Sequence, residues 1–352
     1  MQEAEKQAAG IAASLNDSDL AAQVLLTGID GKVRLTPAMR SLLERIPAGG
    51  VMLFKQNLDS SKEDVKKLLA ETAELAARRT GIPPFMAVDH EGGVVHRFGP
   101  GVEKPPSALS FWDLAQKQGG AAALAGAATV YCRSGREIHE LGITLVLGPV
   151  AETLNGDNRL FLGNRSYGPD PDFTREAASV FIRSMNSAGI ACAVKHFPGN
   201  TGADPHNGAS VLAADRAKLD EMVKPFAGIF RSQEPQAVLV SHVLVPAVDS
   251  QNIASLSRPV IEGWLRGGLG FKGIVLADDF SMAAAAASGF GPAEAAVKAL
   301  NAGVDMVMVW PKNIAAVHAS ILAALRDGRL SRQRLQEAAA RIITGKIRYG
   351  LI

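Results

Sequence analysis

The chain has 352 residues, with 37 lysines and arginines against 35 aspartates and glutamates, so its formal net charge is +2. The basic residues are interleaved with acids, which excludes the concentrated basic face that nucleic-acid-binding proteins use to neutralise phosphates. A hydrophobic content of 47% with 20% charged residues excludes a disordered chain and predicts a large core.

The sequence carries no sign of membrane insertion or of a disulfide framework. The N-terminal segment has no basic region followed by an apolar run, and no stretch approaches the ~20 apolar residues that span a bilayer. The two cysteines, Cys132 and Cys192, have no C-x-x-C spacing. We expect a monomer in the cytoplasm that binds neither membranes nor nucleic acid. The alternative is a periplasmic or secreted protein whose leader is removed before Gln2.

Short apolar or β-branched runs recur along the chain, each followed by a stretch of helical periodicity, which is typical of repeated βα units. Seven runs are predicted strands: 49–54, 84–89, 143–150, 191–197, 237–243, 273–279 and 305–310. An eighth strand is either VLLTGID at 24–30 or lost to an insertion. The predicted helices are 62–79, 121–141, 172–188, 214–231, 292–302 and 313–327.

These units predict the architecture. Strands that are apolar on both faces form parallel sheets covered on both sides, and seven or eight of them close best into a barrel. The sequence therefore predicts an α/β fold, a TIM-type (β/α)8 barrel with one strand irregular or missing. No linker divides the chain, so we expect one catalytic domain over 1–352, with an N-terminal helix at about 1–15 and an outer helix at about 331–349.

Polar residues follow several of the predicted strands. They read Asp89-His90-Glu91, then Lys195-His196, then Ser241-His242, then Asp278-Asp279. Because active sites of parallel barrels lie at the carboxyl ends of the strands, these groups are expected to share one polar cavity. Such charges would be costly to bury without a partner or ligand.

Familiar cofactor and metal motifs do not account for this cavity. GLGFKG at 268–273 fits the dinucleotide pattern G-x-G-x-x-G, but it precedes a predicted strand instead of following one, so it predicts a turn. The seven histidines show no i, i+4 pairing of the kind that binds metals. We therefore expect neither a metal nor an organic cofactor. Carboxylates and histidines around one barrel opening can form hydrogen bonds with the hydroxyl groups of a sugar. A retaining glycosidase needs a carboxylate nucleophile and an acid/base group.

Six blocks extend this interpretation over nearly the whole chain: GGVMLFKQN (49–57), AVDHEGGVVHRF (87–98), GNRSYG (163–168), KHFPG (195–199), LVSHV (239–243) and SLSRPVIEGWLRGGLGFKGIVLADDFSM (255–282). Their order and spacing resemble glycoside hydrolase family 3, and within it the single-domain bacterial β-N-acetylglucosaminidases of the NagZ type. The resemblance implies that Asp278 is the nucleophile. Asp279 is the better candidate for a helix cap and is expected to point away from the cavity.

The resemblance also implies the other site residues. His206, oriented by Asp204 in a loop after KHFPG, is the expected acid/base, and an ordinary turn is the alternative interpretation of this loop. The expected substrate ligands are Asp89, Arg97, Arg165, Lys195 and His196, for which structural ion pairs are the alternative. His242 is expected behind the site, and Met282 in an apolar wall.

The chain departs from the family pattern around the pocket. The loop KHFPGNTGADPH is about two residues shorter than usual, with Asn200 where histidine is common and Pro205 where serine is common. His90, Val94 and His96 are substituted in the second block. AETLNGDN replaces an L-D-x-N pattern.

The expected activity is removal of terminal β-linked N-acetylglucosamine from small glycans, such as muropeptides, by double displacement. Three alternatives stay open: a family 3 β-glucosidase, a β-N-acetylglucosaminide phosphorylase, and a non-catalytic sugar-binding relative. The glucosidases generally take their acid/base from a second domain, and the end of the chain at Ile352 favours the hexosaminidase.

Overall fold

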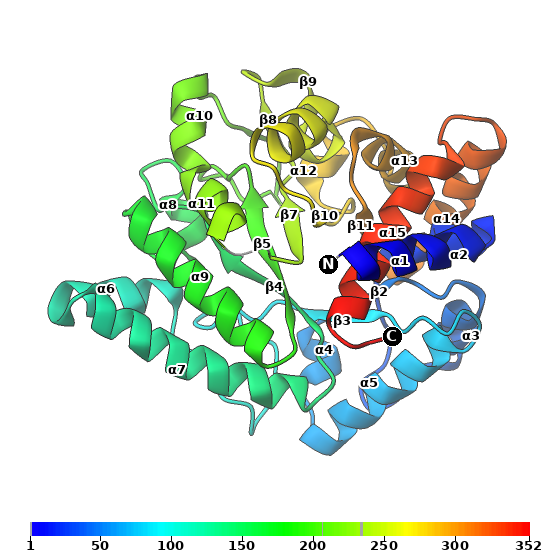
Figure 1. Cartoon of the computed structure of the whole chain (residues 1–352), viewed down its shortest axis with the longest axis horizontal. Helices are drawn as coiled ribbons and strands as arrows, with labels where there is room; N and C mark the ends of the chain where they lie inside the picture. The colour runs from blue at the N-terminus through cyan, green and yellow to red at the C-terminus, as the bar shows by residue number, and fades with distance from the viewer. Residues whose placement is uncertain (1, 206, 233–234) are drawn as a thin grey trace.

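The computed structural model describes residues 2–205, 207–232 and 235–352 and is built around a closed barrel of eight parallel strands (Figure 1). Around the barrel the strands follow the order β1, β11, β10, β7, β5, β4, β3, β2. Their bounds are β1 Leu25–Gly28, β2 Gly50–Leu53, β3 Phe85–Val88, β4 Leu145–Val150, β5 Ala191–Phe197, β7 Ala237–Val240, β10 Ile274–Ala277 and β11 Met306–Val309.

The predicted TIM-type barrel is confirmed, with the eighth strand present. β1 lies within the segment VLLTGID and pairs with both β2 and β11, so it closes the barrel and no strand is missing. Every residue of the eight barrel strands is buried, which explains their continuous apolar runs.

Helices surround the barrel in Figure 1. Three of them begin after a polar N-cap residue, whose side chain accepts a hydrogen bond from a backbone N–H of the first turn. These N-cap residues are Ser61, Asp170 and Ser331. The α-helices of the βα units and their insertions are α3 Pro37–Arg45, α4 Lys55–Leu58, α5 Lys62–Ala77, α6 Ala108–Gln118, α7 Gly120–His139, α8 Arg159–Leu162, α9 Pro171–Ser187, α10 Arg216–Met222, α11 Lys224–Ser232, α12 Ala283–Ala286, α13 Pro292–Ala302 and α14 Pro311–Arg326. Short η1 Gly163–Arg165 and η2 Ala254–Leu256 and the π-helix η3 Pro259–Gly268 complete this set.

Two predicted elements are wrong in extent. The helix expected over 214–231 is two helices, α10 and α11, because Pro225 in the first turn of α11 has no N–H with which to continue α10. The strand expected over 237–243 stops at Val240. Val243–Val245 is instead β8, which pairs with β6 (Ser210–Val211) and β9 (Asp249–Ile253) in a separate small sheet.

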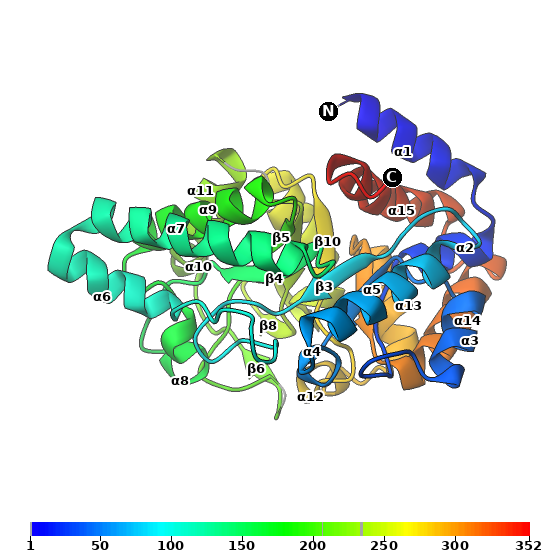
Figure 2. The same cartoon turned by 90° about the horizontal axis from the view of Figure 1, so that it is seen from below.

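The two ends of the chain pack together on one side of the barrel. The C-terminal helix α15 (Arg332–Arg348) packs against both α1 (Gln2–Ser14) and α2 (Asp17–Gln23). In Figure 2, α1 and α15 lie on the opposite side from α8, α12 and the small sheet. The latter elements follow the carboxyl ends of strands, so the side bearing them is the expected active face.

The turn interpretation of GLGFKG is confirmed. η3 ends at Gly268, Gly270 has a positive φ of 72°, and β10 begins at Ile274. Gly270 therefore reverses the chain between a helix and a strand and opens no helix of its own. Over the described ranges, no helix is both long and apolar enough to cross a bilayer.

Candidate active site

The carboxyl ends of the barrel strands enclose a cavity of about 390 Å³, referred to below as the mouth cavity. One half of its wall is polar and the other apolar. The polar half comes from β3, β5 and the segment after β4, and contains Asp89, Glu91, Arg97, Arg165, Lys195, His196 and Asn200. The apolar half comes from the ends of β2 and β11 and from Met282 after β10, and contains Met52, Phe54, Met282, Met308 and Trp310. Asp278, Asp279 and Ser281, which also follow β10, border it.

Lys195 and Arg165 are held by two carboxylates in the polar half. The Lys195 ammonium lies 2.8 Å from Asp89 Oδ1 and 2.5 Å from Glu91 Oε1. Arg165 donates to both oxygens of Glu91, Nε to Oε2 and Nη2 to Oε1, each at 2.8 Å. This bidentate geometry fixes the guanidinium in one orientation toward the cavity. Phe161, whose ring centroid lies 5.4 Å from the guanidinium carbon, supports it from another side.

These ion pairs set the protonation states. Burial would raise the pKa of Glu91, but Lys195 and Arg165 hold that pKa well below its usual range. Burial would likewise raise the pKa of Asp89, and the Lys195 ammonium lowers it. Burial would lower the pKa of Lys195, which its two carboxylates raise instead. All three groups are therefore charged near neutral pH, so Glu91 has no proton to donate to a leaving group.

His196 is oriented by a buried glutamate. Its Nδ1 lies 2.6 Å from Glu152 Oε1, which leaves Nε2 facing the cavity, 3.5 Å from Arg165 Nη2. Glu152 also accepts from the backbone N–H of Asn200 at 2.6 Å and from its side-chain amide at 3.0 Å. The carboxylate therefore joins the end of β5 to the loop that follows KHFPG, and Asn200, which replaces a histidine common in the family, is one of its partners.

Arg97 has capacity left for a ligand. Its Nη2 lies 3.4 Å from Asp89 Oδ2, whereas its buried Nε has no hydrogen-bond partner among the residues that the structure describes. An unpartnered buried donor on the cavity wall is costly unless a ligand or solvent satisfies it. The structure thus brings all five predicted substrate ligands to one cavity, although most of them also form ion pairs with one another.

Asp278 and Asp279 follow β10 directly and both line the mouth cavity. Asp278 Oδ1 accepts the backbone N–H of Asp279 at 2.9 Å. The prediction that Asp279 caps a helix and points away from the cavity is wrong, because Met282 precedes α12 and Asp279 binds the backbone N–H and hydroxyl of Ser281. Asp279 makes a short turn with Ser281 that precedes the N-cap of α12, Met282.

Two further histidines lie near the site, and contrary to expectation His242 lines the mouth cavity itself, whereas His90 does not. His242 Nε2 lies 3.1 Å from the carbonyl oxygen of Asp279, and His242 Nδ1 lies 2.7 Å from the Ser255 hydroxyl. Burial lowers the pKa of His242, so its neutral ring donates to the backbone beside Asp278. His90 bonds the Ser134 hydroxyl at 2.7 Å, and burial together with His96 lowers its pKa to about 3. Both rings are therefore neutral near neutral pH, and neither is a charged acid.

The loop predicted to carry the acid/base reaches the mouth cavity. Asp204 Oδ2 accepts the side-chain amide of Asn207 at 3.0 Å. Pro205 lines the cavity, and its carbonyl oxygen accepts the backbone N–H of Ala284 in α12 at 3.0 Å. His206 lies outside the described residues, so its role stays a prediction. The shortened loop nevertheless brings the residue before His206 to the cavity wall.

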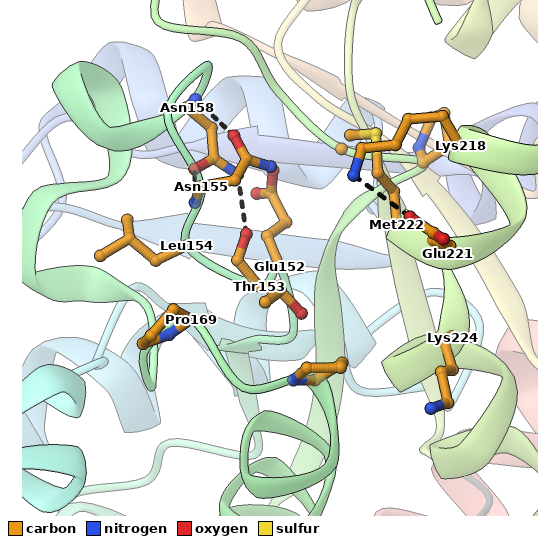
Figure 3. A pocket seen from close by; sticks show the side chains of 13 residues that line it. Glu152, Thr153, Leu154, Asn155, Asn158, Pro169, Lys218, Glu221, Met222 and Lys224 are labelled. Atoms are coloured by element: carbon orange, nitrogen blue, oxygen red, sulfur yellow. Dashed lines mark hydrogen bonds and ion pairs between the residues drawn. The ribbon is translucent and has the colours of Figure 1, made fainter. Parts of the chain in front are cut away.

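A second cavity, of about 330 Å³, is lined by Glu152 and the residues that follow it, and by Lys218, Glu221 and Met222 (Figure 3). It shares no lining residue with the mouth cavity. Its polar groups largely pair with each other: the Asn158 amide donates to the carbonyl of Thr153 at 3.0 Å, and Lys218 lies 3.2 Å from Glu221 (Figure 3). The mouth cavity, by contrast, gathers the charged strand-end residues. We therefore place the chemistry in the mouth cavity.

Glu152 and the aromatic residues of the apolar half are not among the residues predicted from the sequence. The signal for Glu152 was a carboxylate directly after a predicted strand, in the segment AETLN where the family has an aspartate. Phe54 and Trp310 end the runs GGVMLF and DMVMVW, but nothing in either run shows that their rings meet. Within the described ranges, no cluster of three or more histidines, cysteines or carboxylates has the arrangement of a metal site.

Comparison with known proteins agrees with this geometry. Residues 20–344 match the family described as the glycosyl hydrolase family 3 N terminal domain. The chain is 30% identical to beta-hexosaminidase LpqI of Mycobacterium tuberculosis (strain ATCC 25618 / H37Rv), over 96% of this chain and 84% of that protein. It is 27% identical to beta-hexosaminidase A of Pseudoalteromonas piscicida, over 88% of this chain but only 54% of that protein.

A solved structure shares the fold over almost the whole chain. The glycoside hydrolase family 3 beta-N-acetylglucosaminidase from Paenibacillus sp. str. FPU-7 superposes with a TM-score of 0.88 at 32% identity, over 96% of this chain and 63% of that one. The chain therefore spans about half to five sixths of the lengths of these relatives.

Proposed function

Because the chain belongs to glycoside hydrolase family 3, we propose that it is a retaining β-N-acetylglucosaminidase acting on small glycans such as muropeptide fragments of the cell wall. The observation that carries this proposal is the mouth cavity, where Asp278 meets a wall of charged hydrogen-bonding groups. The similarity to beta-hexosaminidases and to the structure of a beta-N-acetylglucosaminidase supports the choice of sugar.

In the proposed reaction the Asp278 carboxylate attacks the anomeric carbon, and the bond from that carbon to the leaving oxygen breaks. His206 gives a proton to the leaving oxygen, which departs as an alcohol. A water molecule then gives its proton back to His206 while its oxygen attacks the anomeric carbon and releases Asp278. Two displacements at one carbon return the sugar in its original β configuration.

The polar half of the cavity would hold the terminal sugar. Asp89 accepts from hydroxyls, Arg165 and Lys195 donate to them, and His196 Nε2, 3.5 Å from Arg165 Nη2, adds a further partner. Glu91 and Glu152 act as positioning residues, since their carboxylates are already occupied by Arg165, Lys195, His196 and Asn200. Ion pairs that are already formed hold these donors in place before the sugar arrives.

The position of the acid/base separates this proposal from a β-glucosidase. The Asp204-Pro205-His206 segment belongs to the loop after β5, and Pro205 lines the cavity. A histidine whose pKa is ordinarily near ~6.5 can both give and take a proton near neutral pH, and a nearby carboxylate can orient it. The proposed enzyme thus takes its nucleophile and its acid/base from the same barrel.

The test is hydrolysis of two aryl glycosides by the purified chain, with and without phosphate. Aryl β-N-acetylglucosaminide should be cleaved at least about tenfold faster than aryl β-glucoside, the scale of one good hydrogen bond. Equal rates would favour a glucosidase. Formation of a sugar phosphate would favour a phosphorylase, and binding without turnover would favour a sugar-binding protein. We also propose that the enzyme is a monomer, which its hydrodynamic mass would test.

A further inference from the structure

The loop that carries Asp204 continues into an Asn-Gly dipeptide, Asn207-Gly208. Asn207 is exposed, and its side-chain amide donates to Asp204 Oδ2 at 3.0 Å. The backbone N–H of Asn207 donates to the carbonyl oxygen of Asp204 at 2.9 Å. Both contacts of Asn207 therefore end on the residue that is expected to orient His206.

Asparagine is a chemically labile residue, and one that precedes a glycine can react with its own backbone. The glycine nitrogen attacks the side-chain carbon Cγ, and the bond from Cγ to Nδ2 breaks. The side-chain nitrogen leaves as ammonia, taking the proton of the glycine N–H, and a five-membered succinimide ring remains. Water then opens this ring at one of its two carbonyl carbons and returns a proton to the glycine nitrogen. The product is aspartate or isoaspartate.

Gly208 meets the structural requirements for this attack. Its N–H forms no hydrogen bond with another residue in the described part of the chain, so the nitrogen is available. A Cβ atom built on Gly208 would meet nothing within 4 Å, so the backbone has room to turn toward the side chain. Before the ring closes, the two hydrogen bonds from Asn207 to Asp204 have to break.

The chain provides an internal comparison, because it has one other Asn-Gly dipeptide, Asn155-Gly156. Asn155 is half-buried, and its Oδ1 accepts the backbone N–H groups of Asp157 at 2.8 Å and of Asn158 at 3.0 Å. Asn158 Oδ1 accepts the backbone N–H of Asn155 at 2.8 Å in return. This side chain is held on the far side from its leaving nitrogen, so Gly156 should reach its Cγ more slowly.

We propose that Asn207 is a site of spontaneous deamidation, and that the product weakens the acid/base of the enzyme. The effect on catalysis rests on the proposed function. A carboxylate at position 207 has no N–H to donate to Asp204 Oδ2, and it stands beside a like charge. Two carboxylates at hydrogen-bond distance repel each other, so Asp204 either turns away or takes up a proton. In both cases His206 loses the fixed, ionised partner that orients it.

Isoaspartate has a second effect, because it lengthens the backbone by one carbon directly after residue 207. The loop around it is closed by a hydrogen bond of 2.7 Å between the hydroxyls of Thr201 and Ser210. Pro205 is tied to α12 through the N–H of Ala284. With both ends held, the added length has to be taken up between Pro205 and Ser210, next to Asp204.

The first experiment follows the modification itself and needs no activity. The purified full chain is kept at mildly alkaline pH, and peptides covering both Asn-Gly dipeptides are followed by mass spectrometry. Asn207 should convert at least about tenfold faster than Asn155, the scale of one more hydrogen bond to break. Gly208→Ala should stop most of this conversion, because its methyl group crowds the attacking nitrogen. Gly156→Ala is the matched control and should leave conversion at Asn207 unchanged.

The second experiment connects the modification to proton transfer. Asn207→Asp should lower kcat for chitobiose, a disaccharide whose leaving sugar must be protonated, by about tenfold, part of the roughly 10²–10⁴-fold effect of general acid–base catalysis. The first step on an activated aryl β-N-acetylglucosaminide should lose much less, and a burst of phenol should appear. Aged wild-type enzyme should show the same pattern, whereas aged Gly208→Ala should keep the activity of the fresh protein.

Several outcomes would overturn the proposal. Equal conversion of Asn155 and Asn207, or none at Asn207, would remove the modification site. Equal slowing of both substrates by Asn207→Asp would assign position 207 to folding or to sugar binding, and an unchanged variant would make the modification silent. If the wild-type protein hydrolyses neither substrate, the proposed function fails, while mass spectrometry still decides whether Asn207 is the reactive asparagine.

Discussion

Asp278 follows the end of a buried strand and lines the mouth cavity, where a carboxylate is well placed to attack a bound sugar. We predict that Asp278→Asn lowers turnover of aryl β-N-acetylglucosaminide by more than about 10³-fold, because the amide cannot form the glycosyl-enzyme bond. Asp279→Asn is the matched control and should retain turnover. Steady-state kinetics with circular dichroism of both variants checks this, and a mechanism-based fluorosugar should label Asp278. A label on any other carboxylate would disprove the assignment.

His206 is predicted from the sequence to protonate the leaving oxygen, and the need for that proton depends on the substrate. His206→Ala should slow hydrolysis of chitobiose by roughly 10²–10⁴-fold, the usual range for general acid–base catalysis. An aryl substrate with an acidic phenol leaves without help, so its first step should suffer much less and a burst of phenol should appear. Pre-steady-state kinetics measures both effects. Equal slowing of both substrates, with no burst, would reduce His206 to a binding or loop residue.

At the scale of elements, Asp305 joins two helices to the barrel. This fully buried carboxylate lies at the start of β11 and accepts from Arg266 of η3 at 2.6 Å and from Arg334 and Arg341 of α15 at 3.0 and 2.9 Å. Burial would raise its pKa, and the three guanidinium groups lower it. The ionised carboxylate therefore stabilises the fold above its ordinary pKa of 3.8, and this stabilisation is lost as the pH falls through the lowered value.

Replacing Asp305 with Asn should leave three arginines without their shared carboxylate. We expect the free energy of unfolding to fall by about 3–5 kcal/mol, the scale of a broken buried ion pair. Urea denaturation near pH 7 measures it. Asp327→Asn, at an exposed carboxylate paired with Arg329, is the control and should change stability little. An unchanged midpoint for Asp305→Asn would show that η3 and α15 do not depend on this residue.

The barrel strands were predictable because a parallel strand buried on both faces has a continuous apolar run, and the helices between them have a different period. Two predicted boundaries are wrong for local reasons. Pro225 divides the helix predicted over 214–231, and after Val240 the chain leaves the barrel to form β8. The charged strand ends predicted the polar half of the site. Glu152 carries the same signal, a carboxylate just after a predicted strand, but its pairing with His196 and Asn200 could not be predicted because it joins distant segments. The stacking of Phe54 on Trp310 could not be predicted for the same reason.

At the scale of the whole molecule, α15 buries a lysine on the side opposite the mouth cavity. Lys346 is fully buried, lies 2.9 Å from Gln23 Oε1, and has its ammonium 5.9 Å from the centroid of the Phe85 ring. Burial lowers the pKa of Lys346 from 10.5 to about 7. Between these two pH values the unfolded chain binds a proton at this lysine that the folded chain does not, so stability should rise with pH across the interval.

Lys346→Met should remove this dependence. The wild-type free energy of unfolding should rise more steeply than that of the variant between about pH 8 and 10, by up to ~1.4 kcal/mol per pH unit. Chemical denaturation at several pH values gives both slopes. Lys272→Met, at an exposed lysine, serves as the control and should keep the wild-type slope. Parallel curves for Lys346→Met and the wild type would mean that Lys346 stays charged in the folded protein.

Closure of the barrel has a consequence for how the protein is made. β1 pairs with β11, and Leu25 meets Val307 across 307 − 25 = 282 positions. A ribosome adds roughly 5–20 residues per second, so β1 leaves the exit tunnel on the order of tens of seconds before its partner exists. During that time one edge of an apolar strand is open to other nascent chains. Phe54 and Trp310, whose stacked rings line the mouth cavity, also meet only after synthesis of β11, so this wall of the cavity is among the last parts of the enzyme to form.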